Sequence, residues 1–244
     1  MFKFLLLALF IVVGGIGNYA ATKKMPSLKQ HQYWIKFFVY ILWVTGVITC
    51  TLHWAWFYTG MAIAVCFIGL IEILRFNKLA SIKDYAIVLV YSTIASGFVL
   101  FCFWAQSTLS EMLIVTFILV CICDGFSQIT GQLFGKIKVL KRISPTKTLE
   151  GFLGGISIMF FSAWFIMHDP MNIQIQNNWA TIAIVVAIGA PIGDVLSSSL
   201  KRYFNIKDFG SYFPGQGGVL DRYDSHIFTG ALFYILHLLK NYYA

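Results

Sequence analysis

Residues 112–129 read MLIVTFILVCICDGFSQI, an apolar run with one carboxylate, Asp124, towards its end. In an α-helix, about 20 such residues cross the hydrocarbon core of a bilayer, which is about 30 Å thick. A helix also satisfies its own backbone hydrogen bonds, as any segment inside lipid must. The stretch therefore predicts a transmembrane helix with an ionisable group near one end.

Similar apolar runs occupy most of the rest of the chain. They cover residues 4–20, 34–50, 54–74, 85–104, 149–167, 179–196 and 226–239. The 244 residues are 59% hydrophobic and 11% charged, whereas soluble domains have about 25% charged residues. We therefore expect an all-α, polytopic integral membrane protein with about eight transmembrane helices and no separate soluble domain. Residues 4–16 resemble the core of a signal peptide, but no small-residue cleavage site follows, so we expect a first span there.

The basic residues alternate between the connections that join these runs. Of the 18 Lys and Arg residues, 16 lie in or beside the first, third, fifth and seventh connections. The positive-inside rule places these connections in the cytoplasm and both termini outside. The net charge of +8 is then explained by topology, and the basic residues can attract anionic head groups or nucleotides. The charge therefore does not indicate a nucleic-acid partner.

The two halves of the chain differ in their acidic residues. Up to residue 120 these are Glu72, Asp84 and Glu111, each near the end of a predicted span, and nothing there indicates chemistry. From Asp124 onward, carboxylates are interleaved with glycines and basic residues. We therefore divide the chain into N-terminal transmembrane helices, residues 1–110, and a C-terminal catalytic region, residues 111–244, with motif loops facing the cytoplasm.

The first polar segment of the second half, residues 123–155, ends in a predicted helix start. Ser144 fits a helix N-cap and Pro145 fits the first helical position. On that interpretation Lys147 is a surface charge. Alternatively, Lys147 beside a helix N-terminus would favour a bound phosphate. Asp124 is a functional candidate because an ionisable group at membrane depth needs a cavity, a partner or a metal.

The second polar segment, residues 189–224, gathers charge around a glycine-rich loop. Helical spacing places Asp194, Ser198 and Lys201 on one side of a helix. The loop PGQGG, residues 214–218, can turn the chain sharply back. Beyond it stand Asp221, Arg222 and Asp224. Carboxylates with neighbouring cations suit Mg²⁺ and phosphates, because Mg²⁺ binds through one or two carboxylates and the phosphates of a substrate.

This segment resembles the motif of the CDP-diacylglycerol synthases, also called phosphatidate cytidylyltransferases. That motif reads approximately S-x-apolar-K-R-x4-K-D-x-small-x2-apolar-P-G-H-G-G-apolar-x-D-R-x-D. The matching residues are Ser198, Leu200, Lys201, Arg202, Lys207, Asp208, Gly210, Phe213, Pro214, Gly215, Gly217, Gly218, Val219, Asp221, Arg222 and Asp224. With the block around Asp124 and Ser144, the resemblance covers about residues 121–226, while the first half agrees only in being helical and apolar.

The resemblance implies that CTP and phosphatidic acid give CDP-diacylglycerol and pyrophosphate at the bacterial inner membrane, with the active site facing the cytoplasm. It implies Mg²⁺ held by Asp194 and Asp221, with a second cation left open, and it suggests a homodimer. The expected catalytic residues are Asp194, Lys201, Arg202, Asp221, Arg222 and Asp224. The expected substrate-binding residues are Asp124, Ser144, Lys147, Ser198, Lys207 and Gln216.

Gln216 departs from the family motif, which has His at this position. Glutamine can donate and accept hydrogen bonds but does not titrate near neutral pH. Gln216 can therefore replace a residue that orients a phosphate, but not one that transfers a proton. Three alternatives stay open: a CTP-dependent transferase acting on another lipid phosphate, a non-catalytic homologue, and a transporter that uses Asp124 and Asp194 along an ion path.

Overall fold

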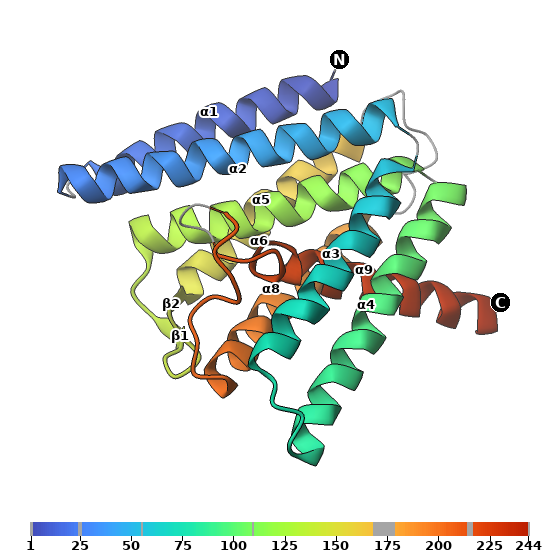
Figure 1. The fold of residues 1–244 in the computed structure, drawn as a ribbon. Helices are drawn as coiled ribbons and strands as arrows, with labels where there is room; N and C mark the ends of the chain where they lie inside the picture. Colours follow the sequence, from blue (N-terminus) through green and yellow to red (C-terminus); the bar gives the residue numbers. More distant parts are fainter. Residues whose placement is uncertain are drawn as a thin grey trace. The chain divides into compact units, whose positions relative to one another are not determined.

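The computed structural model describes residues 2–23, 26–54, 56–108, 110–167, 179–213 and 217–243. Within these ranges the chain is almost entirely helical, as Figure 1 shows. The helices are α1 (Phe2–Thr22), α2 (Ser27–His53), α3 (Phe57–Phe76), α4 (Ile82–Thr108), α5 (Ser110–Phe134), α6 (Leu149–Met167), α8 (Trp179–Tyr203) and α9 (Leu220–Tyr243). Two short strands, β1 (Lys138–Leu140) and β2 (Ser144–Thr148), form an antiparallel pair.

Each of the eight predicted apolar runs lies within or largely overlaps one of these helices, so the all-α prediction is confirmed. Six helices are long and apolar enough to cross a membrane: α2 to α6 and α8. The described residues of α1 that qualify form a shorter apolar helix, Phe10–Thr22, and α9 is not among the six. The chain is an integral membrane protein with six such helices in the part that the structure describes.

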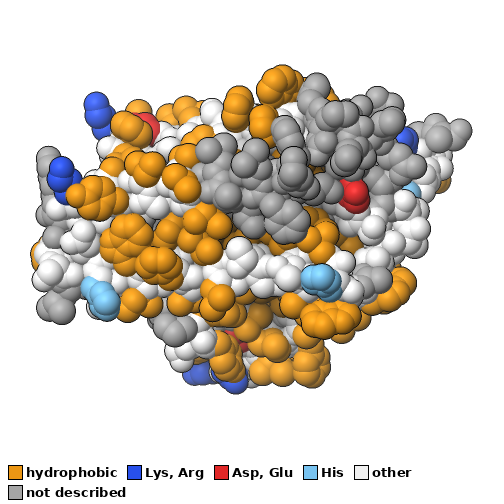
Figure 2. Space-filling model, turned by 90° about the horizontal axis from the view of Figure 1, so that it is seen from above, with side chains coloured by type: hydrophobic (Ala, Val, Ile, Leu, Met, Phe, Trp, Pro, Cys, Tyr) orange, Lys and Arg blue, Asp and Glu red, His pale blue; other side chains and the backbone are white. Residues whose placement is uncertain are grey.

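Hydrophobic side chains on the surface fit a lipid environment. They are spread over the face that Figure 2 shows, with few charged groups between them. Leu42 on α2 is 74% exposed and Ile82 at the start of α4 is 89% exposed. In water such exposure of large apolar groups would be unfavourable, whereas in lipid it carries no such cost.

The described chain forms two compact units, each built from two separate segments. One unit comprises Met1–Ile48 and Val115–Ala187, and the other comprises Thr49–Ile114 and Ile188–Ala244. We call them the hairpin unit, after the β1–β2 pair that it contains, and the motif unit, after the glycine-rich loop. Each unit thus combines an earlier and a later segment of the chain. The division at residue 111 was drawn from where the polar motifs lie, and it stays a prediction.

The motif unit is built on aromatic and small-residue contacts between α4 and α9. The rings of Phe101 and Phe233 stack with centroids 5.3 Å apart, and Trp104 stacks on His237 at 4.1 Å. Helix α3 joins α4 through the Tyr91 hydroxyl, which donates to the carbonyl oxygen of Cys66 at 3.0 Å. Residues from both halves of the sequence therefore support α9, the helix that begins with Asp221 in its first turn.

In the hairpin unit, the predicted helix start at Ser144 and Pro145 is wrong. Residues 144–148 form β2, whose backbone pairs with β1. Helix α6 begins at Leu149, four residues after Pro145. The N-cap is Thr148, whose Oγ1 accepts the N–H of Gly151 at 3.2 Å. Ser144 followed by Pro145 suggested a helix start, but pairing with β1 holds this segment as a strand instead. The pairing was hard to predict, because β1 has only three residues.

Candidate functional site

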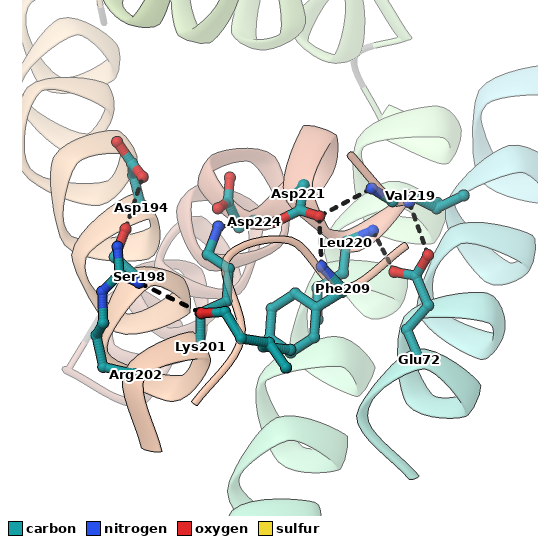
Figure 3. Close-up of polar contacts among 12 residues, drawn as sticks. Glu72, Asp194, Ser198, Lys201, Arg202, Phe209, Val219, Leu220, Asp221 and Asp224 are labelled. Atoms are coloured by element: carbon teal, nitrogen blue, oxygen red, sulfur yellow. Dashed lines mark hydrogen bonds and ion pairs between the residues drawn. The ribbon is translucent and has the colours of Figure 1, made fainter. Parts of the chain in front are cut away.

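Helices α8 and α9 pack closely at the level of their acidic residues. A Cβ atom on Gly193 would lie 2.7 Å from the carbonyl oxygen of Asp224 and 3.0 Å from the Cα atom of Ser225. Small residues allow helices in a membrane to approach in this way. Because Asp194 follows Gly193 on α8, this packing brings its carboxylate towards Asp224 on α9, and both are drawn in Figure 3.

Replacing Gly193 with alanine is expected to push α8 and α9 apart and to destabilise the protein by about 1–3 kcal/mol, the usual cost of overpacking. Gly60 in α3 is the matched control, because nothing lies within 4 Å of the place its Cβ would take. Gly60→Ala should be neutral or slightly stabilising, since alanine favours a helix. Thermal unfolding in detergent measures both. Equal stability of Gly193→Ala and wild type would contradict the close packing.

The central polar contact is an ion pair between Lys201 of α8 and Asp221 of α9. The Lys201 Nζ lies 2.7 Å from Asp221 Oδ1, and the side chains are 13% and 3% exposed. The ammonium also lies over the Phe209 ring, 5.8 Å from its centroid. Burial makes such a pair strongly interdependent, because removing one partner leaves the other as an unpaired charge.

The second oxygen of Asp221 holds the glycine-rich loop. Its Oδ2 accepts the N–H of Phe209 and the N–H of Gly218, each at 2.8 Å. Between these residues the chain reverses direction, since the N–H of Phe213 donates to the carbonyl oxygen of Gly217 at 3.0 Å. Gly217 has a φ of +90°, which only glycine adopts readily. Residues 214–216 of the predicted turn lie outside the described residues; the pairing of Phe213 with Gly217 on either side of them is consistent with it.

Asp224 forms a second polar centre with Asp194 and Lys201. It lies in the first turns of α9, before residues 226–239, the predicted span. Burial, together with the negative charge of Asp194, raises the pKa of Asp224 to about 6, although Lys201 acts in the opposite direction. In Figure 3 the Lys201 ammonium points between Asp224 and Asp221. One cation thus serves two carboxylates, and Asp194 adds a negative charge near Asp224.

This arrangement fits a divalent cation. A carboxylate whose pKa is raised by burial and by another carboxylate is stabilised when positive charge is added. The donors are hard oxygens, and the Ser198 hydroxyl lies 3.5 Å from Asp194 Oδ1. Among the described residues, no three His, Cys, Asp or Glu side chains are grouped closely enough to hold a metal alone. Phosphate oxygens and water would complete the shell, as is common for Mg²⁺.

Three further motif residues lie at or near the ends of α8 and α9. The exposed Arg202 donates from Nη1 to the carbonyl oxygen of Ile206 at 3.3 Å, and Lys207 is exposed in the loop that follows. Arg222 is half-buried, and its Nε has no hydrogen-bond partner within the described ranges. Gln216, with Pro214 and Gly215, lies outside the described residues, so its predicted role stays a prediction.

Three predicted residues belong to the hairpin unit. Asp124 is half-buried on α5, and Ser144 and Lys147 are half-buried on β2. The loop between α5 and β1 is held by Glu150 of α6, whose carboxylate accepts the N–H groups of Lys136 at 3.0 Å and Ile137 at 3.1 Å. The roles of Asp124, Ser144 and Lys147 in binding substrate stay predictions.

Two acidic residues of the first half contact the motif segment, which the sequence did not indicate. Asp84, at the start of α4, accepts the Tyr203 hydroxyl at 3.0 Å and so contacts the end of α8. Glu72 of α3 accepts the N–H groups of Val219 and Leu220, as Figure 3 shows. The rule that made Asp124 a candidate, an ionisable group in an apolar run, also applies to Glu72 and would have found it.

Comparison with known proteins adds family membership to this geometry. Similar proteins include the phosphatidate cytidylyltransferase of Thermotoga maritima, 32% identical over 161 residues, which cover 64% of this chain and 59% of the relative. That of Staphylococcus haemolyticus is 34% identical over 178 residues, covering 71% and 67%. The chain thus matches about three fifths to two thirds of the length of these relatives. The model of the cytidylyltransferase family matches residues 1–239. The chain therefore belongs to the cytidylyltransferase family.

Proposed function

We propose that the protein is a membrane-embedded phosphatidate cytidylyltransferase, a nucleotidyltransferase of phospholipid biosynthesis. In this reaction a phosphate oxygen of phosphatidic acid forms a bond to the α-phosphorus of CTP. The bond from that phosphorus to the oxygen bridging to the β-phosphate breaks, and pyrophosphate leaves with CDP-diacylglycerol as the second product. The observation that carries this proposal is the centre formed by the buried Asp221 with the half-buried Lys201, Asp224 and Asp194 in a chain of this family.

The chemistry of the reaction explains why such a centre is useful. Two anionic substrates must approach each other, and negative charge develops on the leaving pyrophosphate. Fixed cations stabilise that charge without a covalent intermediate. Lys201 would exchange Asp221 for a phosphate oxygen when CTP binds. Arg202, Lys207 and Arg222 lie at or near the ends of the same helices and would hold the other phosphate oxygens.

We further propose that Asp194 and Asp221 hold Mg²⁺, with Asp224 as a supporting carboxylate. Asp221 Oδ1 is occupied by Lys201 in the structure, so release of Lys201 to a phosphate would make this oxygen available. Asp194 and Asp224 already lie within electrostatic reach of each other. When bound, Mg²⁺ would supply positive charge to the triphosphate. A second cation and a homodimer, which the family suggests, stay predictions.

The proposed location is the bacterial inner membrane with the site facing the cytoplasm. The relatives named above are bacterial, and the distribution of basic residues predicts that the connections carrying the motif face the cytoplasm. Alkylation of single cysteines placed in these connections, in intact and in opened cells, would test the orientation. Labelling only in opened cells is the expected result.

The activity is tested by incubating the purified protein in detergent with radiolabelled CTP and phosphatidic acid. We expect label in chloroform-extractable lipid with Mg²⁺ and none after chelation with EDTA. Asp194→Asn should lower incorporation at least about 10²-fold, because it removes a carboxylate proposed to hold Mg²⁺, whose positive charge would stabilise the transition state. Asp221→Asn with normal turnover would refute its role as a metal ligand.

The same assay separates the alternatives. Label that appears only with a different lipid phosphate would keep the reaction and change the substrate. No label with any lipid phosphate, from protein that is folded by circular dichroism, would favour a non-catalytic homologue. Uptake of an ion or solute into vesicles by that protein would instead support a transporter.

A further inference from the structure

Glu72 is a fully buried carboxylate in the half of the chain that does not resemble the family motif. It lies on α3 and is 0% exposed. Its Oε1 accepts the N–H of Val219 at 2.9 Å and its Oε2 accepts the N–H of Leu220 at 2.8 Å. Both donors belong to the first turn of α9 or to the residue before it, where backbone N–H groups lack partners within the helix. The positive end of the helix dipole also favours a carboxylate at this place.

The Glu72 carboxylate fills a space that two motif glycines leave open. A Cβ atom on Gly210 would lie 2.9 Å from Glu72 Oε1, and one on Gly218 would clash with the same oxygen. Gly210 is half-buried and Gly218 is buried, and Gly218 directly precedes Val219 and Leu220, whose N–H groups Glu72 binds. The Glu72 carboxylate therefore packs directly against the end of the loop, at positions where only glycine leaves room for it.

Glu72 and Asp221 hold the same turn from two sides. Glu72 accepts the N–H groups of Val219 and Leu220, while Asp221 accepts those of Gly218 and Phe209. Three consecutive N–H groups are thus bound by two carboxylates, and Figure 3 shows Glu72 and Asp221 on either side of Val219 and Leu220. Because Asp221 directly follows Leu220, any shift of this turn moves Asp221 relative to Lys201.

We infer that Glu72 is a positioning residue for the site: it fixes the start of α9 and thereby the Asp221 carboxylate and its Lys201 partner. This inference rests on the proposed function for its consequence on turnover, but the contact itself does not. A carboxylate is needed because both of its oxygens accept an N–H. In a glutamine, one of these atoms becomes an NH₂ group, which faces an N–H and cannot accept it.

The test compares Glu72→Gln with wild type and with Glu111→Gln, a glutamate of the same unit that lies in the first turn of α5. Hydrogen exchange, read by mass spectrometry on peptides covering residues 217–224, reports the anchoring directly. We expect exchange there to be about 10-fold faster in Glu72→Gln and unchanged in Glu111→Gln, with other segments of α9 unaffected. Unchanged exchange in Glu72→Gln would overturn the inference.

The catalytic consequence is read in the same proteins by CTP incorporation at varied Mg²⁺. Glu72→Gln is expected to lower turnover about 10-fold or more and to raise the Mg²⁺ concentration needed for half activation, whereas Glu72→Asp should recover part of both because it keeps two acceptor oxygens. Loss of turnover in step with unfolding, without a change in the Mg²⁺ midpoint, would reduce Glu72 to a structural residue. No incorporation by wild type would reject the proposed function, while hydrogen exchange still decides the anchoring.

Discussion

Replacing Lys201 with methionine is expected to lower turnover by about 10²–10³-fold, the usual effect of removing one group that stabilises a transition-state charge. The protein should also lose stability, because Asp221 would remain as a buried charge without its cation. Breaking a buried pair costs about 3–5 kcal/mol. We expect a value near the lower end of this range, because two N–H groups still donate to Asp221. Incorporation of label from CTP and thermal unfolding in detergent give the two values.

The double variant Lys201→Met with Asp221→Asn separates stability from catalysis. Asparagine keeps an oxygen that can accept the N–H groups of Phe209 and Gly218, and it leaves no unpaired charge. Most of the lost stability should therefore return while turnover stays low. Lys78→Met, at an exposed lysine of the same unit, should change neither. Recovery of turnover in the double variant would contradict the role of Lys201 in holding phosphate.

Replacing Asp224 with asparagine is expected to stabilise the protein at pH 7.5 in EDTA while lowering its activity. The pKa of Asp224 is raised from 3.8 to about 6 by burial and by Asp194. The folded state then binds the proton more tightly than the unfolded state, so stability falls as the pH rises from about 4 to about 6. A pKa difference of this size corresponds to about 3 kcal/mol. Asp224→Asn does not lose this stability, because asparagine carries no charge at any of these pH values.

The pH dependence of unfolding gives the control for this prediction. At pH 4 Asp224 is largely protonated in the folded wild type, so the variant should have little advantage there. Addition of Mg²⁺ at pH 7.5 should stabilise wild type more than Asp224→Asn, because a cation relieves the repulsion between Asp194 and Asp224. A variant that is less stable than wild type at every pH would show that Asp224 is stabilising as a carboxylate, contrary to this account.

The helices could be predicted from the sequence because apolar length alone determines a membrane span. Residues 149–167 were predicted as a run and form α6 over the same range. The placement of Asp194, Ser198 and Lys201 on one side of α8 was also predictable, since helical spacing fixes it. The strand β2 was missed because its pairing with β1 is not visible in local propensity, and Pro145 suggested a helix start instead.

The contacts across the motif unit were less predictable. The motif suggested that Asp221 binds a metal, but not that its two oxygens are shared between Lys201 and the loop backbone. Glu72 lies 147 residues before Val219, and no local pattern connects them. The sequence motif could not help, because its residues all lie in the second half of the chain. Such long-range contacts depend on how α3 packs against α9, which a single sequence does not specify.

The contact of Glu72 with α9 also has a consequence for how the chain is made. The ribosome completes α3 long before Leu220, which follows Glu72 by 148 residues. Until α9 arrives, Glu72 is a carboxylate in an apolar helix with neither of these donors beside it, and an exposed charge in a membrane segment is costly. A nascent or truncated chain without α9 would thus hold Glu72 at an energetic cost, and the contacts with Val219 and Leu220 would remove that cost once α9 is in place.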